Sequence, residues 1–350
     1  MNRELLTKLA VHYVAPLVTM PPTSVFISPT LRCSSRCAHC GVWRGDSKVP
    51  EMTPSEWAEL LGDPFLRRVG VLWLSGGEPT LRTDLSEIAL RASESLPGLK
   101  SVTVATNALH PFRLEGYLED TVATFEKHGI YTWIHFSLDG PAEIHDRVRG
   151  VEGAFNSLER CVTILRRLKE SGTNIGWGFN CVISALNASY LSGAEDAARD
   201  LGGEITFNLA MPVGGFYRGD DSNLPTARDR VAIRSFIGSL MDRANPYYRR
   251  HYETLLEVLS GKPRRRRCET LEATLYIDPD GSVYPCPACY DEIRLRMYPG
   301  DVRGAWERLA RYRGWVRRGL CRNCALGCSF GEGISLGEFI KLATEGYFET

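Results

Sequence analysis

Six short apolar segments alternate with helical patterns between residues 23 and 209, and this alternation limits the fold more than any other feature. The first helical pattern has clear ends, because it begins at the capping box Thr53-Pro54-Ser55-Glu56 and stops at Gly62. Strands that alternate with helices usually pair in parallel within one sheet or barrel. The predicted strands cover residues 25–28, 71–75, 101–106, 131–139, 175–183 and 204–210.

The later strands carry residues of opposite character on their two faces. Since side chains alternate along a strand, Trp133 and His135 share one face of segment 131–139, and Ile134 lies on the other. The last two strands repeat this pattern, and their small or polar face consists of Gly176, Gly178, Asn180, Thr206 and Asn208. A complete eight-stranded barrel fills its lumen with branched apolar residues. A polar, glycine-lined face therefore predicts a cavity that holds a ligand.

The balance of charge argues against several kinds of partner. The chain has 42 Lys and Arg and 42 Asp and Glu, so no net field attracts nucleic acid or an acidic membrane surface. No run of 18 apolar residues is present, so we expect no membrane-spanning segment. The first 22 residues predict an amphipathic helix rather than a signal peptide, and we expect a cytoplasmic location.

Nine of the eleven cysteines form two groups, which favours metal binding over disulfides in a chain of this length. Cys33, Cys37 and Cys40 follow the first predicted strand. Three thiolates on one loop suit an iron–sulfur cluster with one iron left open. A zinc site with a fourth ligand elsewhere in the chain is the alternative. The second group consists of Cys268, Cys286, Cys289, Cys321, Cys324 and Cys328.

Four motifs together resemble the radical SAM superfamily over roughly residues 23–215. They are CSSRCAHC (33–40), LSGGEPTLR (74–82), VATNA (104–108) and SLDGPAEIHDRVRG (137–150). The resemblance implies an α/β fold, a six-stranded parallel (β/α)6 partial TIM-like barrel. It also implies that Cys33, Cys37 and Cys40 hold a [4Fe–4S] cluster, whose fourth iron is chelated by the amino and carboxylate groups of S-adenosylmethionine.

The same resemblance implies roles for residues around this cluster. Gly76, Gly77, Glu78 and Pro79 would hold the methionine amino group. His135 faces the predicted lumen, where it is either a substrate contact, a proton relay or a structural histidine. Further cofactor contacts are expected from Asn107, Ser137, Arg149, Asn180 and Asn208.

The second cysteine group resembles the auxiliary-cluster extension called SPASM, in its shortened twitch form. It surrounds a hairpin-like segment whose turn includes Gly281. The resemblance implies one auxiliary [4Fe–4S] cluster, and a zinc ribbon is the alternative. Cys289 is a spare thiol, and it is either a fifth ligand, a hydrogen-atom donor to a substrate radical or a simple loop cysteine. The predicted ligands are Cys268, Cys286, Cys321 and Cys324, with Cys328 as a close substitute.

These patterns divide the chain into four parts. Residues 1–22 form a helical extension and residues 23–215 the radical SAM core. Residues 216–262 form a helical connector, and residues 263–350 form a small cysteine-rich domain of a hairpin and helices.

The resemblance implies an enzyme that reductively cleaves S-adenosylmethionine and uses the 5′-deoxyadenosyl radical to take a hydrogen atom from its substrate. Electrons would come from a flavodoxin or ferredoxin system. Only about 22 residues precede the first strand, which favours a small polar substrate such as a sugar, aminocyclitol or nucleoside. Oxidation, epimerisation and decarboxylation all stay open as outcomes. The alternatives are a peptide-modifying maturase with a separate leader-binding partner, and a zinc-stabilised binding protein without catalysis.

Overall fold

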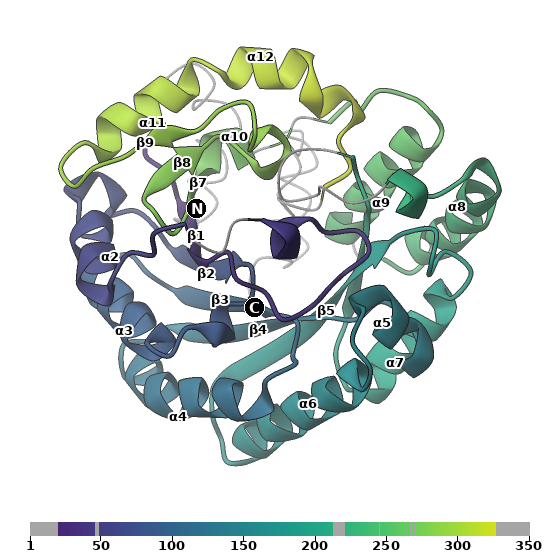
Figure 1. The fold of residues 1–350 in the computed structure, drawn as a ribbon, viewed down its shortest axis with the longest axis horizontal. Coiled ribbons are helices and arrows are strands. Elements are labelled where there is room, and N and C mark those ends of the chain that lie inside the picture. Colours follow the sequence, from purple (N-terminus) through teal and green to yellow (C-terminus); the bar gives the residue numbers. More distant parts are fainter. Residues whose placement is uncertain are drawn as a thin grey trace.

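A computed structural model describes residues 20–45, 49–212, 221–244, 246–266, 268 and 270–326. Its centre is a curved sheet surrounded by helices (Figure 1). Six parallel strands lie in the order β6-β5-β4-β3-β2-β1, which confirms the predicted parallel α/β sheet. These strands are β1 (Ser24–Thr30), β2 (Val71–Gly76), β3 (Ser101–Thr106), β4 (Tyr131–Ser137), β5 (Ile175–Ile183) and β6 (Ile205–Leu209).

Helices connect the successive strands, and their ends follow local sequence signals. The predicted capping box is confirmed, because the Thr53 hydroxyl accepts from Glu56 N and the Glu56 carboxylate accepts from Thr53 N. These hydrogen bonds lower the pKa of Glu56. The connecting helices are α2 (Pro54–Leu61), α3 (Leu85–Ser95), α4 (Pro111–Lys127), α5 (Ala142–Arg149), α6 (Ala154–Glu170) and α7 (Leu191–Asp200).

The sheet continues beyond β1 into the C-terminal hairpin. Strand β7 (Thr274–Ile277) pairs with β1 in parallel, and β8 (Ser282–Tyr284) and β9 (Leu295–Arg296) follow in antiparallel order. The β7–β8 turn uses Gly281 at φ +80, which a glycine adopts without strain. The hairpin thus covers the edge of β1, and β6 and β9 are the two edges of an unclosed nine-stranded sheet.

The remaining helices complete the outer ring. Helices α8 (Ala227–Met241) and α9 (Pro246–Leu259) pack beside β6, and α11 (Val302–Ala310) and α12 (Arg313–Arg318) follow the hairpin, which begins after α10 (Thr270–Ala273) (Figure 1). The predicted helix over residues 1–22 lies outside the described residues, apart from its last three. The predicted domain boundaries near 215 and 262 stay predictions.

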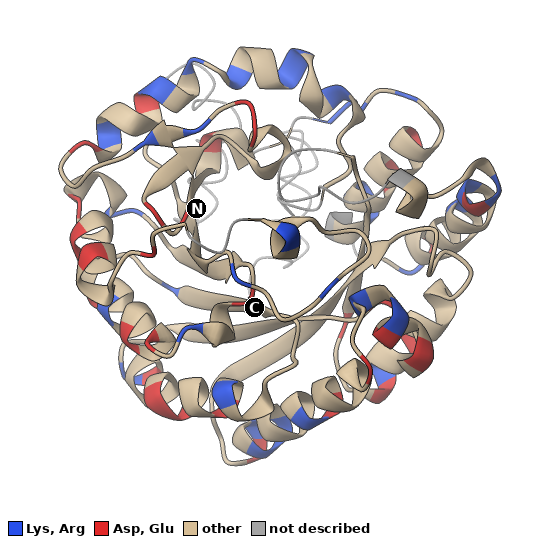
Figure 2. Cartoon of the chain, in the orientation of Figure 1, with Lys and Arg blue, Asp and Glu red and all other residues tan. Residues whose placement is uncertain are grey.

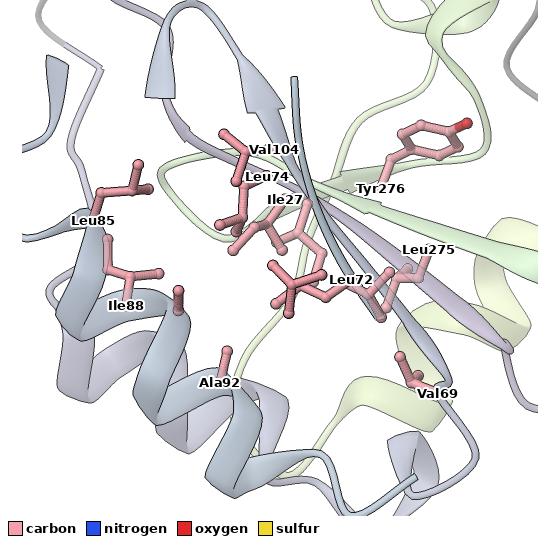
Figure 3. Close-up of a cluster of buried hydrophobic side chains, with 14 of the residues drawn as sticks. Ile27, Val69, Leu72, Leu74, Leu85, Ile88, Ala92, Val104, Leu275 and Tyr276 are labelled. Atoms are coloured by element: carbon pink, nitrogen blue, oxygen red, sulfur yellow. The ribbon is translucent and has the colours of Figure 1, made fainter. Parts of the chain in front are cut away.

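The main hydrophobic core lies between the outer face of the sheet and the helices. Ile27, Leu72 and Leu74 are fully buried and face Leu85 and Ile88 of α3 (Figure 3). Burying one such side chain contributes about 1.5–3 kcal/mol. Tyr276 points away from this cluster in Figure 3, toward the opposite, inner face of the sheet. The alternation predicted for the strands therefore separates a packed outer face from an inner face.

The outer surface carries charges of both signs. Basic and acidic side chains are interspersed around the ring of helices, and basic residues are most frequent over α11 and α12 (Figure 2). Among the helices that the structure describes, none is long and apolar enough to cross a bilayer.

A buried histidine attaches α9 to the edge of the sheet. His251 Nε2 lies 2.8 Å from the Phe207 carbonyl oxygen of β6. Burial lowers the pKa of His251 to about 4, so the folded protein holds it neutral with Nε2–H donating to that carbonyl. A neutral buried histidine makes folding stability sensitive to acid.

We expect the free energy of unfolding to fall as the pH decreases from 6.5 to about 4, because in this window the unfolded chain binds a proton at His251 that the folded chain does not. His251→Gln should remove about 2 kcal/mol of this pH dependence at pH 5. Urea unfolding at several pH values measures the effect. His128→Gln, at the exposed end of α4, is the matched control, and an equal change in both variants contradicts the prediction.

Candidate active site

The loop that carries Cys33, Cys37 and Cys40 follows β1 and crosses the centre of the ring of helices (Figure 1). The glycine turn after β2 runs beside this loop. Gly77 N donates to the Thr30 carbonyl at 2.9 Å, and Glu78 N donates to the Arg32 carbonyl at 2.8 Å. Two motifs far apart in sequence are therefore joined by their backbones.

The glycines of this turn are required by close approach. A Cβ atom at Gly77 would lie 2.2 Å from the Arg32 carbonyl oxygen, and one at Gly76 would lie 2.7 Å from Ser28 Cβ. Gly76 also has φ +100, which side chains rarely tolerate. No larger residue fits at Gly77 without moving the backbone that leads into Cys33.

Glu78 attaches the glycine turn to the end of β3. Its carboxylate is fully buried and accepts from the Thr80 hydroxyl (2.7 Å), the Thr106 hydroxyl (2.8 Å) and Asn107 N (2.7 Å). Burial raises the pKa of Glu78, and the hydrogen bonds oppose that rise. The carboxylate is thus committed to the turn itself, and backbone groups are left for the predicted contact to a methionine amino group.

Asn107 approaches the first cysteine. Its Nδ2 lies 3.8 Å from Cys33 Sγ and 3.3 Å from Ser34 Oγ. The Ser34 hydroxyl also meets His110 Nε2 at 2.9 Å. Burial raises the pKa of the Cys33 thiol to about 11. The amide donor is directed at the sulfur that the sequence predicts to be a metal ligand.

Arg149 contacts the second cysteine and also forms a buried ion pair with Asp139. Its Nη1 donates to Cys37 Sγ at 3.4 Å, and its Nη2 lies 2.6 Å from Asp139 Oδ2. Burial alone would raise the pKa of Asp139, but the Arg149 guanidinium lowers it below its usual range. The Arg149 carbonyl also accepts from Arg36 N at 2.9 Å, so α5 supports the cysteine loop by side chain and backbone.

The arrangement fits a thiolate-held cluster. Asn107 and Arg149 supply donors to two of the three sulfurs, and hydrogen bonds to sulfur are usual for such ligands. In the described part of the chain, the buried His39 Nδ1 and Arg149 Nε have no partner within the protein. Burial lowers the pKa of His39 to about 4. Within the same residues, no three His, Cys, Asp or Glu side chains are already gathered at ligand spacing.

Other predicted cofactor contacts form a polar inner wall. Ser137 of β4 pairs with Asn180 of β5 in register, and Asn180 pairs with Thr206 of β6. Asn208 Nδ2 donates to Asn180 Oδ1, and the Thr206 hydroxyl lies 3.4 Å from the same oxygen. The structure thus brings together Ser137, Asn180 and Asn208, while their contact to a cofactor stays a prediction.

The glycines of the inner face beneath this wall lie against Trp133. A Cβ at Gly176 would lie 2.7 Å from the Trp133 ring, and one at Gly178 would lie 2.8 Å from it. The glycines therefore accommodate an indole, and Gly176 and Trp133 line a pocket together with Lys169. His135 follows Trp133 by two residues on the same face of β4, and its ring centroid lies 5.8 Å from that of Trp73. Burial lowers the pKa of His135 to about 4.

The second cysteine group lies around the base of the hairpin. Cys286 Sγ and Cys289 Sγ are 3.6 Å apart, and Cys289 is fully buried. Burial, together with the neighbouring Cys268 and Cys324 thiols, raises the pKa of Cys321 to about 12. The five described thiols of this group therefore form a pair, Cys286 and Cys289, and a trio, Cys268, Cys321 and Cys324. Cys328 lies outside the described residues, and the choice of ligands stays a prediction.

Sequence reasoning missed a charged network that braces the cysteine loop. Glu51 accepts from Arg32 Nε at 3.1 Å and from Arg82 Nη1 at 3.3 Å. Arg82 also donates to the Pro29 carbonyl and forms two 2.7 Å contacts with Asp84. The available signal was the position of Arg82 at the end of motif 74–82. Nothing in the sequence marked Glu51 as its partner.

Residues 27–186 match the family model "Radical SAM superfamily". Residues 27–186 therefore form a radical SAM domain, and the enzymes of that superfamily use a [4Fe–4S] cluster and S-adenosylmethionine. The C-terminal cysteine-rich region accompanies it as in SPASM/twitch-type members.

Several known proteins resemble the chain beyond the barrel motifs. Pre-heme d1 synthase of Dinoroseobacter shibae is 31% identical over 64% of this chain and 52% of its own length. The mycofactocin maturase of Mycobacterium tuberculosis is 25% identical over 81% of this chain and 70% of its own. The first two curated relatives are matched over only about half (52%) and a third (35%) of their length.

Solved structures show the same fold at low sequence identity. SuiB of Streptococcus suis bound to precursor peptide SuiA is 16% identical, with a TM-score of 0.62 over 94% of this chain and 75% of that one. The anSMEcpe enzyme with bound AdoMet is 18% identical, with a TM-score of 0.60 over 94% and 99%.

Gly77→Ala should displace the cysteine loop, because the new Cβ overlaps the Arg32 carbonyl. We expect a loss of about 1–3 kcal/mol of unfolding free energy and a lower iron content. Gly116→Ala is the matched control, since no atom lies within 4 Å of its Cβ position in α4, and it should stabilise by about 0.5–1 kcal/mol. Chemical unfolding and iron analysis of both variants test this expectation. Equal changes in stability and iron content in the two variants would refute the packing explanation.

Arg149→Met should cost about 3–5 kcal/mol, because it leaves the buried Asp139 carboxylate without its cation. It should also reduce the iron retained on the cysteine loop. The double variant Asp139→Asn, Arg149→Met should recover part of the stability, since no buried charge is then unpaired. Urea unfolding of the single and double variants measures the coupling, and strictly additive losses would show that the pair does not interact.

Proposed function

We propose that this chain is a radical SAM enzyme that modifies a residue of a peptide. The mycofactocin maturase carries this proposal, because its similarity spans 81% of the chain, whereas the barrel motif region 27–186 is less than half of the 350 residues. The similarity therefore includes sequence outside the barrel motifs. A fold-level neighbour, SuiB, is described as bound to its precursor peptide. This support favours a peptide over the small polar intermediate that the sequence suggested.

In this proposal Cys33, Cys37 and Cys40 hold the [4Fe–4S] cluster. With S-adenosylmethionine bound, such a cofactor supplies the radical that removes a hydrogen atom from the substrate. The backbone of Gly76 and Gly77 receives the amino end of S-adenosylmethionine. Asn107 and Arg149 orient the cysteine sulfurs through hydrogen bonds.

The polar wall orients the remainder of the cofactor. Ser137 and Asn180 lie on adjacent strands and present a hydroxyl and an amide to the ribose and carboxylate, with Asn208 supporting Asn180. The buried surroundings of Glu78 and Arg149 keep water from the reacting groups. His135 is neutral and so suits a packing or hydrogen-bonding role more than that of a charged contact.

The hairpin thiols hold one auxiliary cluster in this proposal. Cys268, Cys321 and Cys324 provide three ligands and Cys286 the fourth. Cys289, fully buried beside Cys286, is a fifth thiol of the same environment. A flavodoxin or ferredoxin system in the cytoplasm supplies electrons, and a separate protein presents the peptide.

A tetrapyrrole is the second candidate substrate. The 31% identity with pre-heme d1 synthase favours it, although that match covers 64% of this chain and 52% of the relative. The peptide proposal is preferred because its supporting match extends further along both chains.

Anaerobic purification should yield about eight irons per chain, falling to about four when Cys33, Cys37 and Cys40 are all replaced by Ala. The control is the pair of core cysteines, since Cys161→Ala and Cys181→Ala should leave the iron count unchanged; both are fully buried in hydrophobic clusters. Zinc in place of iron would refute radical chemistry.

The substrate class is then tested by measuring the release of deoxyadenosine with pools of peptides, tetrapyrroles or aminosugars. Stimulation of this release by aminosugars alone would contradict the peptide proposal.

A further inference from the structure

A row of aromatic rings follows the inner face of the sheet across several strands. Phe26 of β1 stacks on Trp73 of β2, with centroids 6.0 Å apart and planes 16° apart. On its other side Phe26 meets Tyr276 of β7 at 5.1 Å. Trp73 meets His135 of β4 edge-on at 5.8 Å. Three of these inner rings, Phe26, Trp73 and His135, are called the aromatic floor.

The aromatic floor keeps part of its surface accessible. All three of its rings are half-buried, whereas the residues that alternate with them, such as Ile27, Leu72 and Ile134, are fully buried against the helices. A face that served only for packing would be closed like the outer face. Exposed aromatic surface inside a barrel is instead typical of a ligand site.

The floor lies below the site that the cysteine loop and glycine turn define. Trp73 precedes Gly76 by three residues on β2, which places it roughly 10 Å from the turn at 3.3 Å per residue. Small side chains on β3, Thr103 and Ala105, separate the rings of β2 from those of β4.

The floor is also uncharged. His135 is its one titratable member, and burial keeps that imidazole neutral near pH 7. The polar groups Ser137, Asn180 and Asn208 lie further along the strands, toward the cysteine loop. The inner surface therefore has a polar end at the cofactor site and an apolar end beneath it.

We propose that the aromatic floor binds an aromatic side chain of the substrate, stacked on Trp73 and Phe26. The inference rests on the proposed peptide substrate and narrows it to peptides with Phe, Tyr or Trp at or beside the modified residue. Stacking on the floor directs the carbons next to the ring toward the glycine turn. Rings in such offset or edge-on contact favour each other beyond the area that they bury.

The test uses the reconstituted holoenzyme with S-adenosylmethionine and two matched pairs of probes. One pair is acetyl-Gly-Gly-Phe-Gly-Gly-amide and its Ala counterpart; the other is phenyl and methyl β-glucoside. Calorimetric titration should give at least about tenfold tighter binding of the Phe peptide than of the Ala peptide. Trp73→Ala should remove this preference, and Trp73→Phe should retain most of it.

Phe112→Ala is the matched control, because Phe112 is 84% exposed on α4, away from the inner face. It should leave the preference unchanged. Peptides that bind without any preference for Phe, or a preference that survives Trp73→Ala, would overturn the aromatic site while leaving the peptide proposal intact. A phenyl preference among the glucosides only would support the floor and contradict the peptide substrate. No preference in either pair, or no binding of any probe, refutes the inference.

Discussion

The backbone pairing between the glycine turn and the cysteine loop is the constraint on which the site depends. It brings Gly77 and Glu78 onto Thr30 and Arg32 through two hydrogen bonds, with no room for a side chain at Gly77. Glu78 then extends the contact to β3, and Arg149 extends it to α5. A loop of thiols is thereby fixed by three separate elements, so its geometry depends on rigid strands and a helix more than on the loop itself.

The fold divides its two faces by function. The outer face of each strand is closed by helices and supplies the stability of the barrel, as Ile27 and Leu72 illustrate. The inner face is less closely packed and more accessible to solvent. Its partly exposed rings and amides stabilise the fold less than the buried side chains of the outer face do. This division is a common compromise in enzymes, whose sites retain groups that a purely structural core would bury or omit.

The sequence predicted the elements well because its signals are local. Strand alternation, the Thr53 capping box and the cysteine and glycine motifs each depend on neighbouring residues, and the structure confirms the sheet and the cap. The features that the sequence did not reveal depend on distant contacts. Trp133 packs on Gly176 and Gly178 from the next strand. The pairing of Asp139 with Arg149 and of Glu51 with Arg82 likewise requires knowledge of the folded chain.

The pairing of β1 with β7 joins the start of the chain to its last quarter. The Ser24 and Thr274 hydroxyls, 250 residues apart in sequence, meet at 2.9 Å. During synthesis at about 5–20 residues per second, roughly 12–50 s pass between the emergence of these two strands. Until then the edge of β1 next to the cysteine loop is unpaired and open to other chains. Completion of the sheet beside β1 therefore waits for the last quarter of the chain.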